Sequence, residues 1–253
     1  MKGWAMAGLV LRDRRRRILG LLAFAALFLA AAIAARLLTG GEDGHVEMDR
    51  LFTMGGYPLV SALLLLGWML GRFPMIAVLV LMAGFYSADR RDGQARLYLT
   101  RPTSPLGVYA VRWLILILAS FALSAVLMPA FDMIMLGALP GIGMLALAGA
   151  YILVYGGLTA LVSVWVRGDA WIAAGLAIAA MVWDALRRAD ALAIAPGARD
   201  FIGFLLPPQA ALFQLETAFG QLQPVPWGAF IYCAAYGLVM LALAGVSMLN
   251  REV

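Results

Sequence analysis

The sequence predicts an all-α polytopic membrane protein with six transmembrane helices, an N-terminal amphipathic helix and a cytoplasmic helix between the second and third spans. Of its 253 residues, 64% are hydrophobic, whereas about 45–50% is usual for soluble domains. The mean hydropathy is +0.92. Several apolar runs reach the roughly 20 residues that a helix needs to cross a bilayer. These observations indicate one transmembrane domain, residues 1–253.

The N-terminal residues 1–17 predict an amphipathic helix on the membrane surface. The apolar stretch 4–11 precedes an arginine cluster at 12–17, an order opposite to that of a signal peptide. The first span follows at 18–38, and the acidic stretch 40–57 is expected outside. Small side chains, which let helices approach closely, form a stripe on this span: Ala23, Ala26, Ala30 and Ala34.

The second apolar run, 58–86, is too long for one straight crossing, since a helix rises about 1.5 Å per residue and the hydrocarbon core is roughly 30 Å thick. The sequence Gly71-Arg72-Phe73-Pro74 interrupts it. The favoured interpretation is one long helix kinked at Pro74, which breaks the hydrogen-bond ladder. The alternative is an outer helix at 58–70 that leads into a span beginning at Arg72.

The remaining spans are predicted at 108–136, 142–166, 170–186 and 227–249. The turn 137–141 is short, so the third and fourth spans should be antiparallel neighbours. The interruption 187–226 predicts short helices at the outer interface, near 201–206 and 210–219, separated by Pro207 and Pro208. The fifth span carries a second stripe of small residues: Ala173, Ala174, Ala177 and Ala180.

Lysine and arginine set the expected orientation, because they are retained on the cytoplasmic side. They gather at the N-terminus, in 87–107 and at Arg167, and are fewer in 40–57 and 187–226. Both termini are therefore expected in the cytoplasm. The net charge of +5 is explained by this topology and does not indicate nucleic-acid binding.

The polar segment 87–107 predicts a short cytoplasmic helix. Asp92 is a suitable N-cap, and Pro102 forces the residue before it out of the helical region. Between them, Ala95, Tyr98 and Leu99 share one face. A short amphipathic helix between two spans is typical of a segment that contacts a cytosolic partner.

The same segment carries a spaced pattern. It has an acidic residue, a glycine four positions later, leucines, a proline nine after the glycine, a serine, and a basic residue opening the third span. These are Asp89, Gly93, Leu97, Leu99, Pro102, Ser104 and Arg112. The pattern and the six-span layout resemble permeases of the type-2 ABC exporter superfamily. The chain departs from that pattern at Asp89 (usually Glu), Gln94 (usually Thr), Pro105 (often basic) and Arg112 (usually Lys).

The resemblance implies that residues 93–100 form a coupling helix seated in a groove of a cytosolic ATPase. Two ATPase copies and two permease copies, identical or paralogous, would then form an exporter in a prokaryotic cytoplasmic membrane. The first and fifth spans would meet across the dimer axis. ATP and Mg would be bound by the ATPase, with no cofactor in this chain. The coupling residues would be Asp89, Asp92, Gly93, Ala95, Leu97, Tyr98, Leu99, Pro102 and Ser104.

Other functions are weighed against this one. The sequence contains no phosphate-binding loop of the form G-x-x-x-x-G-K-[ST], so ATP hydrolysis is not expected of this chain. A membrane scaffold or assembly factor without cargo is the alternative outside transport. A lipid phosphotransferase is the enzymatic alternative, because residues 89–96 faintly resemble the D-x-x-D-G-x-x-A-R opening of CDP-alcohol phosphotransferases. The downstream aspartates that a two-metal site needs are absent.

The candidate charged residues inside the membrane are Arg72, Asp132 and Asp184. Such residues usually pair inside a bundle or line a water-filled path. We expect Arg72 and Asp132 to form an ion pair, with a role in a substrate path as the alternative. His45 and Cys233 are single residues of their kinds, and neither indicates a metal site.

Overall fold

The computed structural model describes residues 3–39, 61, 68–69, 71–92, 105–137, 139, 141–191 and 194–252. All regular structure in these ranges is helical, which confirms the predicted fold class. The helices are α1 (Gly3–Asp13), α2 (Arg15–Thr39), α4 (Phe73–Met82), α5 (Ser87–Arg91), α7 (Pro105–Leu136), α8 (Ile142–Trp165), α9 (Asp169–Arg188), α10 (Pro196–Leu205), α11 (Gln209–Gly220) and α12 (Trp227–Glu252).

Six stretches of the described residues are long and apolar enough to cross a membrane, as predicted. They are Arg15–Leu37, Phe73–Arg91, Leu106–Met135, Ile142–Trp165, Asp169–Arg188 and Trp227–Asn250. Pro207 and Pro208 separate α10 from α11, also as predicted. Helix α7 runs through Pro129 without a break.

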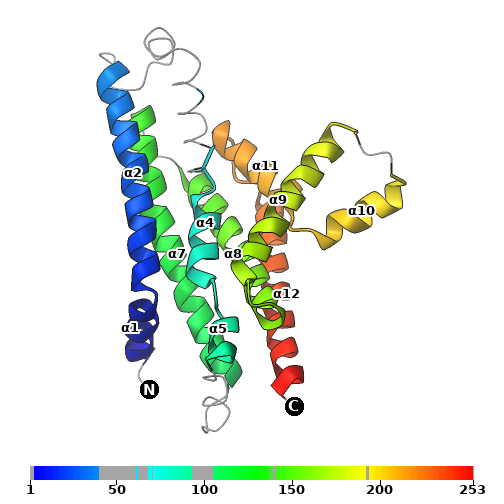
Figure 1. Cartoon of the computed structure of the whole chain (residues 1–253). Coiled ribbons are helices and arrows are strands. Elements are labelled where there is room, and N and C mark those ends of the chain that lie inside the picture. Colours follow the sequence, from blue (N-terminus) through cyan, green and yellow to red (C-terminus); the bar gives the residue numbers. More distant parts are fainter. Residues whose placement is uncertain are drawn as a thin grey trace.

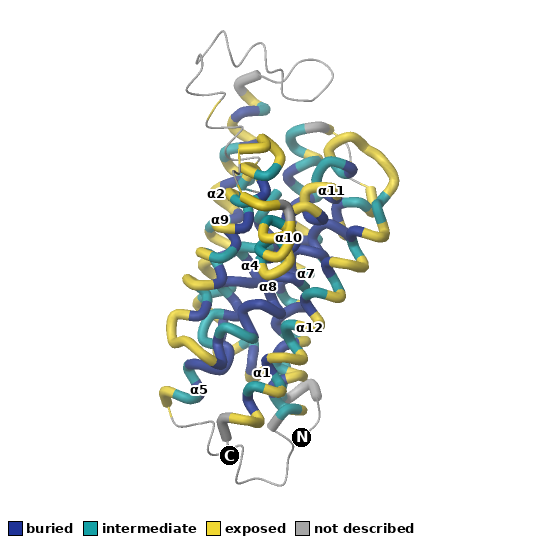
Figure 2. The backbone as a smooth tube through the Cα atoms, turned by 90° about the vertical axis from the view of Figure 1, so that its right-hand side faces the viewer, coloured by how far each residue is buried: buried dark blue, intermediate teal, exposed yellow. Residues whose placement is uncertain are grey.

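Helix α8 is the centre of the bundle and packs against α4, α7, α9, α11 and α12. Its side chains Leu147, Tyr151, Ile152 and Tyr155 are fully enclosed, and buried residues concentrate along it in Figure 2. Helices α2, α9 and α12 lie outside it and expose large apolar side chains. Those exposed faces suit contact with lipid, because lipid chains are as apolar as leucine.

Two glycines allow α8 and α12 to cross with their backbones in contact. A Cβ placed on Gly157 would overlap the carbonyl group of Gly237, and a Cβ on Gly237 would overlap the carbonyl of Leu153. Only a residue without a side chain permits this approach. This is the closest helix crossing that the described glycines reveal.

Both chain termini lie at one end of the bundle together with α1 and α5, and we call this the terminal end (Figure 1). Helix α11 and the start of α4 lie toward the other end, which we call the opposite end. Helix α10 packs on α9 and projects away from the bundle.

Some predicted boundaries were wrong. The N-terminal helix does not continue to Arg17: α1 ends at Asp13, and α2 begins at Arg15. Arg14 between them is buried, because its guanidinium donates to backbone carbonyls of a neighbouring span.

The second span is interrupted at Arg72, which precedes α4, as predicted. Residues 58–60, 62–67 and 70, on which both the kinked helix and the outer helix at 58–70 were predicted, lie outside the described residues.

The two stripes of small residues have different surroundings. On α2 the stripe at 23, 26, 30 and 34 is exposed. On α9, Ala173, Ala177 and Ala180 are buried within the chain, where α9 packs on α8 and α4. The α9 stripe therefore serves packing inside one chain and is not available to a second copy. The exposed face of α9 carries larger side chains, among them Trp171 and Ile178.

Candidate functional site

The first cluster of polar side chains lies at the terminal end and is built around Asp89 in α5. The Asp89 carboxylate is 2.5 Å from Arg112 Nη1 and accepts a hydrogen bond of 3.2 Å from the Tyr109 hydroxyl. Tyr109 and Arg112 are three residues apart on α7, so both reach the same point. Only 8% of the Asp89 side chain and 11% of the Arg112 side chain are exposed. A charge-assisted pair so enclosed fixes α5 against α7.

Arg112 extends this connection to α1. Its Nη2 atom lies 3.9 Å from the Asp13 carboxylate, and its guanidinium lies 5.8 Å from the centre of the Phe85 ring, within cation–π range. Asp13 is also 3.3 Å from the Nε atom of Arg14. One arginine of α7 therefore contacts both the N-terminal helix and the second span.

Arg14 and Arg17 bind the turn that separates α4 from α5, residues 83–86. Both guanidinium groups donate to the carbonyl of Ala83. Arg14 also reaches the carbonyl of Gly84 at 3.4 Å, and Arg17 that of Val80 at 3.3 Å. Gly84 has a φ of +70°, a backbone conformation that favours glycine. The arginines satisfy carbonyl groups that the end of α4 leaves without helical partners.

The other side of the same turn is held by Asp169, the first residue of α9. Its carboxylate accepts from the Gly84 amide at 2.9 and 3.0 Å, from the Ser87 hydroxyl at 3.1 Å and from the Ala170 amide at 2.8 Å. Arg90 donates to the carbonyl of Val164 at the end of α8, at 2.9 Å. Helices α2, α4, α5, α8 and α9 are thus joined at one place.

The predicted coupling residues are only partly within the described ranges. Asp89 lies in the cluster just described. Asp92, expected to cap a helix beginning at Gly93, follows the last turn of α5, and its carboxylate pairs with exposed Arg91 at 3.1 Å. The others lie outside the described residues: Gly93, Ala95, Leu97, Tyr98, Leu99, Pro102 and Ser104.

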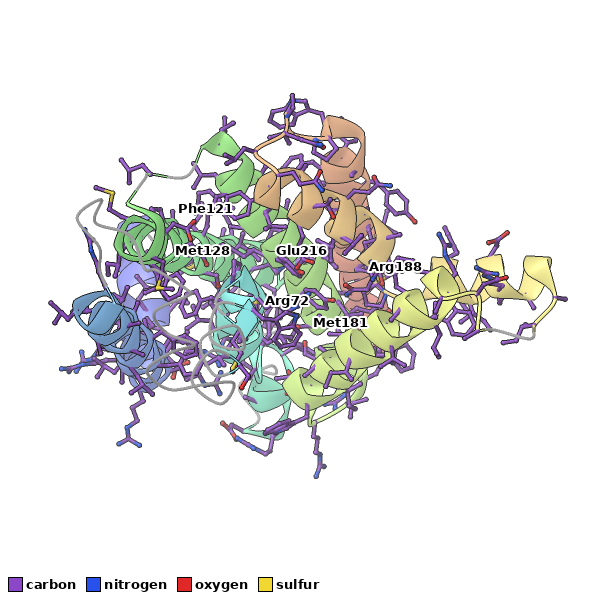
Figure 3. All side chains as sticks on the ribbon, turned by 90° about the horizontal axis from the view of Figure 1, so that it is seen from above. Arg72, Phe121, Met128, Met181, Arg188 and Glu216 are labelled. Carbon is purple, nitrogen blue, oxygen red and sulfur yellow. The ribbon has the colours of Figure 1, made fainter. Side chains whose placement is uncertain are left out.

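A second cluster, at the opposite end, corrects the expected partner of Arg72. Arg72 pairs with Glu216 of α11 at 3.2 Å, not with Asp132. The two labelled side chains point toward each other in Figure 3. Helix α11 packs on α8 beside the start of α4, which brings Glu216 to Arg72. Asp132 is half-buried on α7 and makes no ion pair within the described part of the chain.

Two tyrosines of α8 extend the second cluster into the bundle. The Tyr151 hydroxyl donates to Glu216 Oε1 at 2.5 Å, and the amide of Gln209 donates to the Tyr155 hydroxyl. The sequence interpretation missed Glu216, Gln209 and both tyrosines. A single carboxylate in the largely apolar stretch 209–220 was the available signal, since such a group needs a partner.

Asp184, the third predicted ionisable residue, forms an ion pair of 2.9 Å with Arg188 one turn later on α9. The Arg188 guanidinium also lies 3.7 Å from the centre of the Phe213 ring, and Figure 3 shows Arg188 on α9, away from the Arg72–Glu216 pair. These contacts connect α9 to α11.

Separating the Arg72–Glu216 pair is expected to lower the free energy of unfolding by about 1.5–3 kcal/mol, the usual contribution of hydrogen bonds to charged groups. Arg72→Leu and Glu216→Leu should each show this loss in thermal unfolding in detergent. The double variant should lose less than the sum of the two, because the residues interact. Asp132→Leu is the matched control and should be additive with Arg72→Leu. Additive losses for Arg72 and Glu216 would contradict the pairing.

The fold and these clusters define a polytopic α-helical membrane protein whose polar side chains link helices at the two ends of the bundle. No group of three His, Cys, Asp or Glu side chains within the described residues could hold a metal ion. No family model, curated protein or solved structure matches this chain. Its function is therefore argued from the residues themselves.

Proposed function

We propose that this chain is the permease subunit of an ABC exporter of the type-2 superfamily. It would move a substrate across a prokaryotic cytoplasmic membrane, driven by a separate ATPase subunit. The observation that supports this most is the ion pair between Asp89 and Arg112, 23 residues apart in sequence. These are the acidic position that opens the superfamily pattern and the basic position that closes it.

The Asp89–Arg112 pair suggests how movement of the coupling segment would reach the transmembrane helices. The residues between α5 and α7, 93–104, would carry the coupling helix, and the Asp89–Arg112 pair holds together the two helices that flank them. A displacement of that segment by the ATPase would move α5 and α7 as one body. Through the 83–86 turn it would also act on α4, and through Asp169 on α9. Rigid movement of helices against each other is how alternating access proceeds.

The terminal end is the one that we propose to face the cytoplasm. Arginines at the start of α2, in α5 and at the α8–α9 turn lie at this end, and short cytoplasmic segments retain such residues. Two ATPase copies would bind there, one on each of two permease copies. ATP and Mg would be held by the ATPase, and this chain would supply the path and the coupling segment.

A double change in the coupling segment, Leu97→Asp with Leu99→Asp, is expected to release the ATPase while leaving the permease inserted. Leu99 belongs to the predicted apolar face and Leu97 flanks it, and a carboxylate at either position would have to be desolvated in the groove, which costs several kcal/mol without a partner. The measurement is co-purification of the ATPase with the tagged permease from membranes that express both.

The matched control is Leu222→Asp, which makes the same change at an exposed position after α11. It should retain the ATPase at the normal yield. Retention of the ATPase by the 97/99 double variant would contradict the coupling role. Absence of any co-purifying ATPase with the unchanged permease would contradict the proposed function itself and favour a scaffold.

A further inference from the structure

An open pocket of about 240 Å³ lies at the terminal end, between the start of α2, the 83–86 turn, α5 and the α8–α9 turn. Three arginines from different parts of the chain line it: Arg17, Arg91 and Arg167. Apart from the orientation of the chain, the proposed function gives no role to Arg91 or Arg167, and neither Asp89 nor Arg112 lines the pocket.

The one carboxylate that lines this pocket, Asp169, offsets only part of the charge of the three arginines, and its hydrogen bonds go to other groups. Both oxygens of Asp169 accept hydrogen bonds from backbone amides, and one also accepts from Ser87. Hydrogen bonding of this kind occupies the carboxylate with fixed protein donors. The lining therefore has an excess of positive charge, three guanidinium groups against one carboxylate.

The arginines differ in how free their side chains are. Arg17 is anchored to backbone carbonyls of the turn. Arg167 is exposed, and its side chain makes no ion pair with any residue in the described ranges. Arg91 pairs with Asp92, but 67% and 51% of these two side chains are exposed, so the pair contributes little and can separate. Arg91 and Arg167 can both turn toward a ligand in the pocket.

The pocket lies at the ends of two candidate spans, where lipid headgroups are expected. Arg17 is in the first turn of the span Arg15–Leu37, and the span Asp169–Arg188 begins at the pocket wall. Trp171, which also lines the pocket, is 85% exposed. Tryptophan is enriched at the membrane–water interface, where its ring sits among headgroups. A ligand could therefore enter from the membrane surface as well as from water.

We propose that this pocket binds a phosphate group, supplied either by an anionic lipid headgroup or by free phosphate. Arginine matches the geometry of phosphate with paired N–H donors, and basic pockets between transmembrane helices bind lipid headgroups. The pocket would hold the group between α2 and α9, with Arg17 as the fixed contact and Arg91 and Arg167 closing over it.

The test is a titration of the purified full-length protein in detergent, followed by native mass spectrometry and thermal unfolding. The probes are phosphatidylglycerol, zwitterionic phosphatidylcholine, and inorganic phosphate. We expect phosphatidylglycerol or phosphate to bind and raise the melting temperature, and phosphatidylcholine to have a much weaker effect. Arg167→Gln and Arg91→Gln should each weaken binding about fivefold. One arginine near an anionic headgroup raises the binding affinity by about that factor.

Arg15→Gln is the matched control, because it removes the same charge from an exposed arginine at the same end that does not line the pocket. Its affinity for either probe should be unchanged. Binding of phosphatidylglycerol but not phosphate identifies the lipid as the source, and the reverse identifies a soluble anion. Equal loss in Arg15→Gln and Arg167→Gln, or no binding of either probe, would overturn the proposal. The readout needs no ATPase, so it stands or fails independently of the exporter function.

Discussion

Gly157→Ala and Gly237→Ala are each expected to lower the free energy of unfolding by at least about 3 kcal/mol, at or beyond the upper end of the usual cost of overpacking. Each added methyl group would overlap a backbone carbonyl of the facing helix. A flexible side chain could move aside, but a helix backbone cannot without separating α8 from α12. Unfolding of the purified variants in detergent, followed by circular dichroism, measures the loss.

Gly175→Ala provides the control for these two variants. Gly175 lies inside α9, is exposed, and has no atom within 4 Å of the added methyl position. The change should be neutral or stabilise by up to about 1 kcal/mol, because alanine is the better helix former. If Gly157→Ala and Gly175→Ala unfolded alike, the backbones of α8 and α12 would not be in contact.

Breaking the Asp89–Arg112 pair is expected to lower the free energy of unfolding about as much as the two glycine substitutions. Asp89→Leu or Arg112→Leu leaves a buried charge without its main partner, which typically costs about 3–5 kcal/mol. Replacing both, Asp89→Leu with Arg112→Leu, should cost considerably less than the sum of the two single losses. Thermal unfolding of the three variants in detergent provides the measurement.

The exposed pair between Arg91 and Asp92 is the comparison for this experiment. Asp92→Ala removes a carboxylate of the same kind three residues further along, just after α5, but more than half of the Arg91 and Asp92 side chains is in solvent. Its expected effect is below about 1 kcal/mol. A double variant at 89 and 112 that lost the sum of the single losses would show that the two residues do not stabilise each other.

The spans could be predicted from the sequence because length and apolarity are local properties of a segment. The predicted ranges 142–166 and 170–186 agree with α8 and α9 to within two residues at each end. The interruptions at Arg72 and at Pro207–Pro208 were equally local, since proline acts on its own helix.

Partners between helices could not be predicted in this way. Asp132 was expected to pair with Arg72 because ionisable residues in apolar spans usually pair inside a bundle, but pairing depends on which faces the helices turn toward each other. Glu216 is the partner because α11 folds back against α8, and nothing in residues 209–220 alone specifies that return. The alanines of α9 were similarly ambiguous, since close packing within one chain and between two chains requires the same small residues.

The way in which Arg14 and Arg17 hold the 83–86 turn also bears on the order in which the protein assembles. The carbonyl groups at the end of a helix need donors from elsewhere, and the second span receives two of them from Arg14 and Arg17. Its donors lie in the first helices, which leave the ribosome before the turn does. The acceptors are therefore synthesised only after their donors are in place. In a chain without its first 17 residues these carbonyls would have to pair with water instead, and we expect the 83–86 turn to be held less firmly.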